Sequence, residues 1–281
     1  MASTEHALGE EHLPGCLKLS RSANWNQNEA DWRLMLGFGR GWGITTADGT
    51  LAASTVALPY GAGFAWIAMV LVLPEHRRQG YASRLLRVAL AAMASQLRVS
   101  LLDATPAGHD VYVQEGFRDF WGFKRFALSL SHGKFTGEGT VPLKEAHWPQ
   151  IFALDADAFG GSREAVLRNL ADRQPGMALV AERNGAIAGF VLAREGREAL
   201  QVGPLVARDE ETARRLLGAA LAKARLPVYV DITDRAASLQ AWALAQGFAI
   251  QRPFTRMAHG PGGYAPGDAS LVFCPAGPEL G

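Results

Sequence analysis

A pattern of residues in the first half of the chain recurs in the second half at a fixed spacing. Three landmarks of the first half reappear 131 positions later. Because three landmarks agree on one spacing, we interpret them as two copies of one structural unit. A chain of 281 residues is long enough for two domains of ordinary size. The landmark pairs are Arg84-Leu85-Leu86 and Arg215-Leu216-Leu217, Gly116-Phe117 and Gly247-Phe248, and Arg125 and Arg256.

Both copies follow the same order of predicted elements, and this order indicates an α/β fold. A helix precedes a hairpin, whose turn is Asp48-Gly49 in the first copy and Asn184-Gly185 in the second. A further strand, a long helix (82–96 and 210–225), a buried strand, a short helix before Gly-Phe and a last strand complete each copy. The alternation predicts two tandem domains, each with a mixed, mostly antiparallel sheet flanked by helices.

A glycine-rich polar stretch, residues 131–139, separates the two copies. We therefore predict domains at 1–133 and 134–281. The tail beyond Gly260 contains many Gly and Pro residues, and we expect it to be a loose wrap or partly disordered.

Composition excludes several classes of protein. The net charge of +1 argues against a broad nucleic-acid or membrane footprint. The two cysteines, Cys16 and Cys274, stand far apart, so we expect no disulfide framework and a cytoplasmic location. The seven histidines lack ligand spacing, so we expect no metal. Neither a signal peptide nor an apolar membrane span is evident.

Residues 70–90 combine an apolar strand, a short basic turn and an amphipathic helix. Such a turn can leave N–H groups unpaired at a helix N-terminus, where the helix dipole favours an anion. Gly80 and Ala82 keep the turn free of bulk, and Arg77 and Arg78 add positive charge. The pattern predicts a phosphate or pyrophosphate site; the alternative is an ordinary strand–turn–helix with a basic turn.

The order Arg77-x-x-Gly80-x-Ala82 after a Val-x-Val strand resembles the acetyl-CoA loop, Q/R-x-x-G-x-G/A, of the GNAT N-acetyltransferases. The resemblance implies that acetyl-CoA is the co-substrate. It further implies that the strand residues Val70, Leu71 and Val72 face the pantetheine arm. By the same resemblance, the pyrophosphate is held by Arg77, Arg78, Gln79, Gly80, Tyr81, Ala82 and Ser83.

The resemblance also points to a catalytic acid. Members of the family often carry a tyrosine four residues before a Gly-Phe pair, and Tyr112 has this spacing from Gly116-Phe117. A phenol with a pKa near 10 can protonate a departing thiolate. The alternative is a tyrosine that only packs in the core.

The general base is less evident. Many relatives place a glutamate on the fourth strand, but residues 64–73 contain no acid. Asp103 and, less favoured, His109 are the nearest candidates. Asp103 could equally cap the Thr105-Pro106 turn, and water could carry the proton instead.

An acceptor site is predicted before the first strong helix. The segment from Trp25 to Trp32 corresponds to one wall of the acceptor site in the resembled family, and its Trp-Asn-Gln run also resembles a bacterial subgroup with two tandem units. Tryptophans beside amides suit a small polar or cationic molecule. The predicted contacts are Trp25, Asn26, Gln27 and Trp32; the alternative is that both tryptophans are core anchors.

The second copy lacks both features. Three consecutive acids, Asp209 to Glu211, stand where the pyrophosphate would bind, and acids at a helix N-terminus repel phosphate. Ala243 replaces the tyrosine. We therefore expect a degenerate second domain that completes the acceptor cleft, or alternatively one that holds a separate sensor pocket.

These observations together favour an acetyl-CoA-dependent N-acetyltransferase. The expected acceptor is a primary amine of a small molecule, and the resemblance to the GNAT family implies that it attacks directly in a ternary complex. The alternative function is an acyl-CoA-binding regulatory module without turnover. Because the two copies can pack as a pseudo-dimer, we expect a monomer or a weak homodimer.

Overall fold

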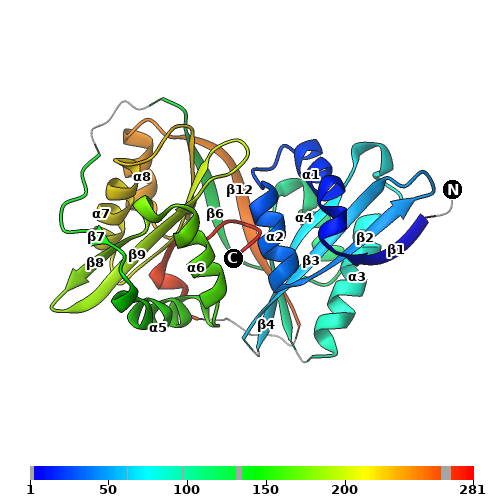
Figure 1. Ribbon diagram of the computed structural model, residues 1–281, viewed down its shortest axis with the longest axis horizontal. Coiled ribbons are helices and arrows are strands. Elements are labelled where there is room, and N and C mark those ends of the chain that lie inside the picture. Colours follow the sequence, from blue (N-terminus) through cyan, green and yellow to red (C-terminus); the bar gives the residue numbers. More distant parts are fainter. Residues whose placement is uncertain (1–2, 62, 97, 131–134, 261–266) are drawn as a thin grey trace. The chain divides into compact units, whose positions relative to one another are not determined.

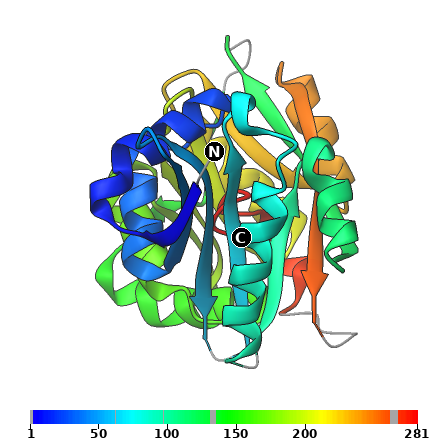
Figure 2. The same ribbon diagram turned by 90° about the vertical axis from the view of Figure 1, so that its right-hand side faces the viewer.

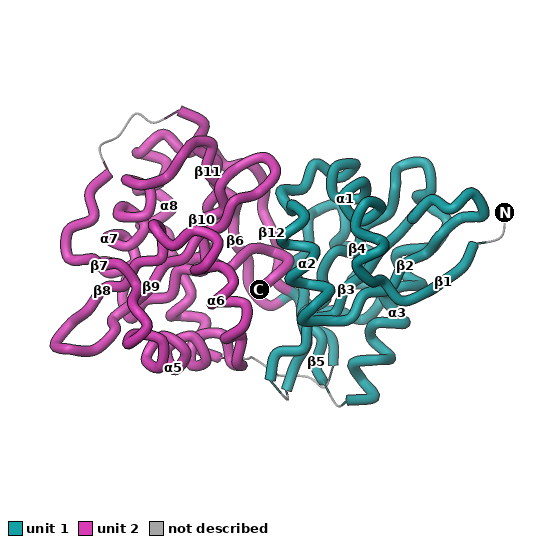
Figure 3. The backbone as a smooth tube through the Cα atoms, in the orientation of Figure 1, with its two compact units in different colours: residues 1–119, 257–264 teal, residues 120–256, 265–281 magenta. Residues whose placement is uncertain are grey.

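The computed structural model describes residues 3–61, 63–96, 98–130, 135–260 and 267–281 (Figure 1). The chain forms two compact units (Figure 3). Of the described residues, unit 1 holds 3–119 and 257–260, and unit 2 holds 120–256 and 267–281.

Unit 1 contains a sheet with the strand order β1-β2-β3-β4-β5, next to which β12 stands. All of β3 except Pro59 is buried, so helices must cover both faces of the sheet. The helices α1 and α2 lie on one face, and α3 and α4 lie on the other (Figure 2). The elements are β1 Ser3–Leu8, α1 Leu13–Ser22, α2 Glu29–Phe38, β2 Arg40–Thr46, β3 Leu51–Tyr60, β4 Phe64–Val72, α3 Tyr81–Ala94, β5 Val99–Ala104 and α4 Pro106–Gln114.

Unit 2 repeats this arrangement with the strand order β12-β6-β11-β10-β9-β8-β7, and β13 pairs with β10. The apolar face of α7 packs on β8, β9 and β10, and this contact forms the core of the unit. The elements are β6 Arg118–Leu128, β7 Val141–Pro142, α5 Trp148–Phe159, α6 Glu164–Arg173, β8 Leu179–Arg183, β9 Ala186–Arg194, β10 Leu200–Ala207, α7 Glu210–Leu221, β11 Val228–Thr233, α8 Ala237–Ala245, β12 Ala249–His259 and β13 Val272–Cys274.

Short 3-10 helices connect several of these elements. They are η1 Glu10–His12, η2 Pro74–His76, η3 Glu145–His147, η4 Pro175–Met177 and η5 Ala269–Leu271. None of the helices in the described ranges is both long and apolar enough to cross a membrane.

The mixed sheets flanked by helices confirm the fold class predicted from the sequence. Both hairpins turn where predicted, with Gly49 and Gly185 at positive φ. In each copy a short helix ends just before a glycine at positive φ, Gly116 or Gly247, and the next strand begins two residues later. Glycine takes this left-handed conformation without strain, which explains why the Gly-Phe landmark recurs.

The last strand of the first copy, β6, belongs to unit 2 rather than to unit 1. It pairs there with β11, from Leu128 opposite Val228 to Phe123 opposite Thr233. The final residues of β12 are grouped with unit 1. The compact units therefore divide the chain differently from the predicted domains, whose boundary after residue 133 lies outside the described residues and stays a prediction.

The expectation of a loose tail is wrong for the described residues 267–281. They include η5 and β13, and Val272, Cys274 and Leu280 are buried. The Gly and Pro content of the tail suggested disorder, but these apolar side chains bury enough surface to order the segment.

A buried ion pair links β6 to β11. Arg125 donates two hydrogen bonds to the Asp231 carboxylate, at 2.8 and 2.7 Å, and both side chains are almost fully enclosed. Gln201 on β10 donates a third, at 3.1 Å. Because water cannot reach this carboxylate, the negative charge of Asp231 is stabilised by these donors.

We therefore expect Arg125→Ala to destabilise the protein by about 3–5 kcal/mol, since it leaves the Asp231 charge buried and unpaired. Urea unfolding followed by circular dichroism would measure the loss. The control is Arg33→Ala, which removes an exposed pair with Glu29 and should barely move the midpoint. Equal shifts for the two variants would contradict the assignment.

Candidate active site

The turn between β4 and α3 has the backbone of an anion site. Arg78 and Gly80 both have positive φ, of 64° and 76°. Gly80 is the N-cap residue of α3 and supplies no side-chain cap. A Cβ at Gly80 would meet nothing within 4 Å, so a ligand can approach this backbone. Successive amides in such a turn form a concave nest for anions.

The amides of this turn are not consumed by the fold. The Arg77 N–H bonds to the Pro74 carbonyl at 3.3 Å, and the Arg84 N–H bonds to the Gly80 carbonyl at 3.0 Å. Within the part of the chain that the structure describes, the N–H groups of residues 78–83 have no hydrogen-bond partner. These donors stand at the positive end of the α3 dipole, which suits a phosphate group.

The corresponding helix of unit 2 is capped from within. Asp209 is the N-cap residue of α7, and its carboxylate accepts from the Thr212 N–H at 2.8 Å. It also pairs with Arg183 at 2.9 Å. Burial acts to raise the Asp209 pKa, but the hydrogen bonds and Arg183 outweigh it and hold the pKa below its usual value. The start of α7 therefore carries its own anion.

The strand β4 leaves its parallel partner early. It pairs with β5 only from Phe64 opposite Val99 to Trp66 opposite Leu101. Farther along β4, Met69 and Val70 stand opposite the single residue Thr55 of β3, which is a β-bulge. Beyond Trp66, the side of β4 that faces β5 is thus not paired with that strand.

Backbone strain is concentrated at this bulge. Met69 has a φ of 52°, which is uncommon for a residue with a side chain. The buried Ser54 hydroxyl donates to the Met69 carbonyl at 2.8 Å and helps to hold the bulge in place. Of the predicted pantetheine contacts that follow, Val70 and Val72 are half-buried and Leu71 is buried, so Leu71 can contribute mainly its backbone.

Tyr112 on α4 packs in the hydrophobic cluster that contains Leu85 and Leu86 of α3. The half-buried Val70 and Val72 pack against the same cluster, so this core joins the predicted acid to the predicted cofactor strand. Burial raises the pKa of the Tyr112 phenol, which keeps it protonated at neutral pH.

The surroundings of Tyr112 leave its hydroxyl available. The ring meets Phe117 edge-to-face, with ring centroids 5.9 Å apart. No described residue forms a hydrogen bond with the hydroxyl. A protonated phenol without an internal acceptor can give its proton to a ligand.

The two candidate bases differ in their surroundings. Asp103 is half-buried near the end of β5. His109 on α4 forms a hydrogen bond with Asp119 at 2.8 Å through Nε2. The N-cap residue of α4 is Thr105, whose own side chain does not cap the helix.

The predicted acceptor residues divide into two groups. Trp32 is fully buried, and its Nε1 donates to the Ser20 hydroxyl at 2.9 Å, so it anchors α2 in the core. Trp25 is half-exposed. Asn26 and Gln27 lie between them in sequence and are buried at 2 and 3 % exposure. Any contribution of Trp32 to an acceptor site would be to position α2.

The predicted capping box of α2 is present. The Asn28 side chain accepts from the Asp31 N–H at 3.1 Å, and the Asp31 carboxylate accepts from the Asn28 N–H at 2.9 Å. This box fixes the chain direction just after Gln27. The side-chain oxygen Oε1 of Gln27 is buried and has no hydrogen-bond partner among the described residues. An unpaired buried acceptor favours a donor from a ligand or water.

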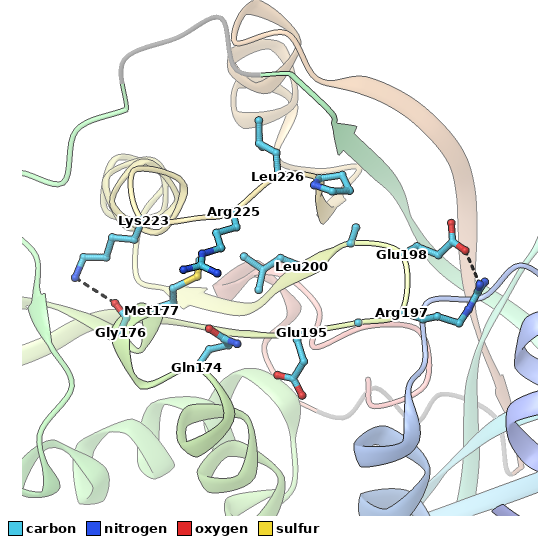
Figure 4. A pocket seen from close by; sticks show the side chains of 13 residues that line it. Gln174, Gly176, Met177, Glu195, Arg197, Glu198, Leu200, Lys223, Arg225 and Leu226 are labelled. Atoms are coloured by element: carbon cyan, nitrogen blue, oxygen red, sulfur yellow. Dashed lines mark hydrogen bonds and ion pairs between the residues drawn. The ribbon is translucent and has the colours of Figure 1, made fainter. Parts of the chain in front are cut away.

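Sequence reasoning did not find a hollow of about 790 Å³ in unit 2 (Figure 4). It lies where β10 and β11 begin, and its lining includes the cations Lys223 and Arg225 and the acids Glu195 and Glu198. None of the predicted site residues lines it. Within the described ranges, no cluster of three or more His, Cys, Asp or Glu residues could hold a metal ion.

Comparisons with known proteins identify the family of the chain. Residues 10–117 match the acetyltransferase (GNAT) family model, and residues 151–273 match an acetyltransferase (GNAT) domain model. The uncharacterized N-acetyltransferase YitH of Bacillus subtilis (strain 168) is 24 % identical over 244 residues, which is 86 % of each chain.

Solved structures share the whole fold. A proposed acetyltransferase from Pyrococcus horikoshii superposes with a TM-score of 0.82 at 19 % identity, over 99 % of this chain and 96 % of that one. A tandem GNAT protein from the clavulanic acid biosynthesis pathway gives 0.66 at 16 % identity, over 93 % and 100 %. With a family match in each half and a two-copy fold throughout, the chain belongs to the GNAT family of N-acetyltransferases and carries two of its domains in tandem.

Proposed function

We propose that unit 1 binds acetyl-CoA and transfers its acetyl group to a primary amine of a small molecule by direct attack in a ternary complex. The observation that carries this proposal is the row of unpartnered amides at the start of α3. The matching helix of unit 2 fills the same position with Asp209. The two units therefore differ in the feature that a pyrophosphate requires.

Most of the proposed contacts with CoA are made by backbone groups. The amides of residues 78–83 would hold the pyrophosphate, with the exposed Arg78 side chain beside it. Arg78 makes no hydrogen bond or ion pair within the described chain, so its charge is available. Arg77 donates to the Val72 carbonyl at 3.3 Å and thereby ties the turn to β4. The backbone of β4 beyond the bulge would pair with the pantetheine arm.

The reaction needs few groups. Acetyl-CoA supplies the thioester, and the neutral amine forms the new C–N bond as the C–S bond breaks. The thiolate then takes a proton, for which Tyr112 is the proposed donor. The proton that the amine loses passes to Asp103 or to water.

The acceptor would bind beside Trp25, Asn26 and Gln27. Gln27 carries the strongest indication, because leaving a buried acceptor atom unpaired costs about 1–3 kcal/mol. An amine can donate to this oxygen before it loses its proton. Buried amides next to a half-exposed indole suit a small polar molecule.

Charge reversal in the turn tests the CoA site. We expect Arg78→Glu combined with Gly80→Glu to weaken binding of desulfo-CoA at least tenfold, measured by calorimetry. Two like charges about 4 Å apart cost about 1 kcal/mol in water and several times more near a protein surface. The matched control is Glu211→Lys at the start of α7, which should leave the affinity unchanged. Unchanged affinity in the double variant would remove the assignment.

Removing one hydroxyl tests the acid. We expect Tyr112→Phe to lower kcat about 100-fold and to leave KM for acetyl-CoA within about twofold. Thiol release in the presence of an amine panel would measure both. Tyr60→Phe, which removes another buried hydroxyl of unit 1, is the control. Full kcat in Tyr112→Phe would show that the thiolate finds its proton elsewhere.

The pH profile gives a second measure of the same residue. An acid works below its pKa, and burial raises the pKa of Tyr112 above its usual value near 10. We therefore expect no alkaline fall in kcat from this group below about pH 10.

Gln27→Leu tests the acceptor wall. We expect KM for the amine to rise about tenfold, while the affinity for desulfo-CoA stays the same, because the amide lies on the acceptor segment. The exposed Gln114→Leu serves as the control. A change in the affinity for desulfo-CoA would contradict the assignment of Gln27 to the acceptor site. If the unaltered protein binds CoA but forms no product with any amine, the regulatory module is favoured.

A further inference from the structure

Each of the two sheets has a β-bulge just beyond the end of its short parallel pairing. In unit 2, β10 pairs with β11 only from Leu200 opposite Val228 to Val202 opposite Val230. Gly203 and Pro204 then stand opposite the single residue Leu192 of β9. This bulge corresponds to Met69 and Val70 opposite Thr55 in unit 1. The next residues, Leu205 and Val206, therefore correspond to Leu71 and Val72.

In unit 2 this stretch of β10 already has a partner. The strand β13 pairs with it in antiparallel fashion, Leu205 opposite Cys274 and Val206 opposite Val272. The Thr233 hydroxyl at the end of β11 donates to the Val272 carbonyl at 3.3 Å. Thus β13 lies against both strands where their own pairing has stopped.

The backbone of β10 is shaped to receive this segment. A Cβ at Gly203 would overlap the Pro275 carbonyl oxygen, so only glycine permits the approach. Cys274, Ala276 and Leu280 are all fully buried. Burial on this scale identifies the segment as a fixed part of unit 2.

Two buried arginines secure the residues that follow β13. Arg194 at the end of β9 forms an ion pair with Glu279, and both side chains are at most 2 % exposed. Arg163 donates to the main-chain oxygen of Gly281. Arg163 is itself held by the Asp155 carboxylate through two hydrogen bonds of 2.9 Å. The segment is therefore anchored by charge as well as by apolar contact.

We propose that residues 272–281 are an internal ligand of unit 2, occupying the strand edge that corresponds to the pantetheine edge of unit 1, so that the chain binds one CoA and not two. The correspondence with pantetheine rests on the function proposed for unit 1. The occupation of β10 and the acidic cap of α7 are separate obstacles. One blocks the arm and the other repels the pyrophosphate.

Cys274 provides a reporter inside the segment. In a Cys16→Ala variant it is the one remaining thiol of the chain. Burial and the nearby Asp231 raise its pKa well above the usual value, so an alkylating reagent reacts slowly unless the segment leaves. Desulfo-CoA has no thiol and can be added at saturation without consuming the reagent.

The experiment measures desulfo-CoA stoichiometry by calorimetry and the alkylation rate of Cys274 by mass spectrometry. We expect one site per chain and slow alkylation that desulfo-CoA does not change. Glu279→Gln in the Cys16→Ala background removes the charge that faces Arg194. It should speed alkylation at least tenfold while the stoichiometry stays at one, because Asp209 still caps α7. The matched control is Glu198→Gln, an exposed carboxylate of the same unit, which should leave the rate unchanged.

Two sites per chain, faster alkylation with desulfo-CoA, or an unchanged rate in Glu279→Gln would overturn the proposal. If the chain binds no CoA, only the function proposed for unit 1 is contradicted. The alkylation rates then test whether residues 272–281 are an internal ligand. If Glu279→Gln does not fold, hydrogen exchange of residues 272–274 in the unaltered chain tests the proposal instead. Protected amides with and without desulfo-CoA support an internal ligand, and fast exchange refutes it.

Discussion

The early end of the parallel pairing between β4 and β5 is the constraint on which the site depends. Hydrogen bonds between parallel strands are evenly spaced, and here they stop after Trp66 because the bulge at Met69 turns β4 away. The strain at Met69 is held by a buried hydroxyl from the neighbouring strand. Beyond the bulge the edge of β4 is not paired with β5, and among the described residues the amides at the start of α3 have no hydrogen-bond partner either. In the proposed CoA site, one extended ligand would use both of these sets of backbone groups.

Unit 2 shows how the same scaffold behaves when both features are satisfied internally. Asp209 caps the helix, and β13 pairs with the strand beyond the bulge. The N-acetyltransferase fold is therefore compatible with a strand edge and a helix start that are occupied by the chain itself. The two copies differ at the starts of α3 and α7 and along β4 and β10 beyond their bulges, whereas both cores are built from apolar strands and helices.

The sequence was informative where chemistry and backbone conformation coincide. The hairpin glycines, the Gly-Phe turn and the loop at Gly80 each need a positive φ, so their positions could be predicted. The placement of β6 in unit 2 could not be predicted, because the residue pattern of a strand does not identify the strand with which it pairs. Nor could the buried role of Trp32, since a tryptophan anchors cores and lines ligand sites alike. The tail was misjudged because its Gly and Pro content conceals the short apolar run Leu271 to Cys274.

The placement of β6 has a consequence for the history of the chain. Each copy of the repeat is completed by the closing strand of the other, since β12 stands next to β5 and β6 stands next to β11. A gene that lost either half would encode a sheet with a bare edge, and such edges promote aggregation. After the duplication, neither copy could be deleted without exposing an edge of the remaining sheet. The two copies therefore depend on each other structurally.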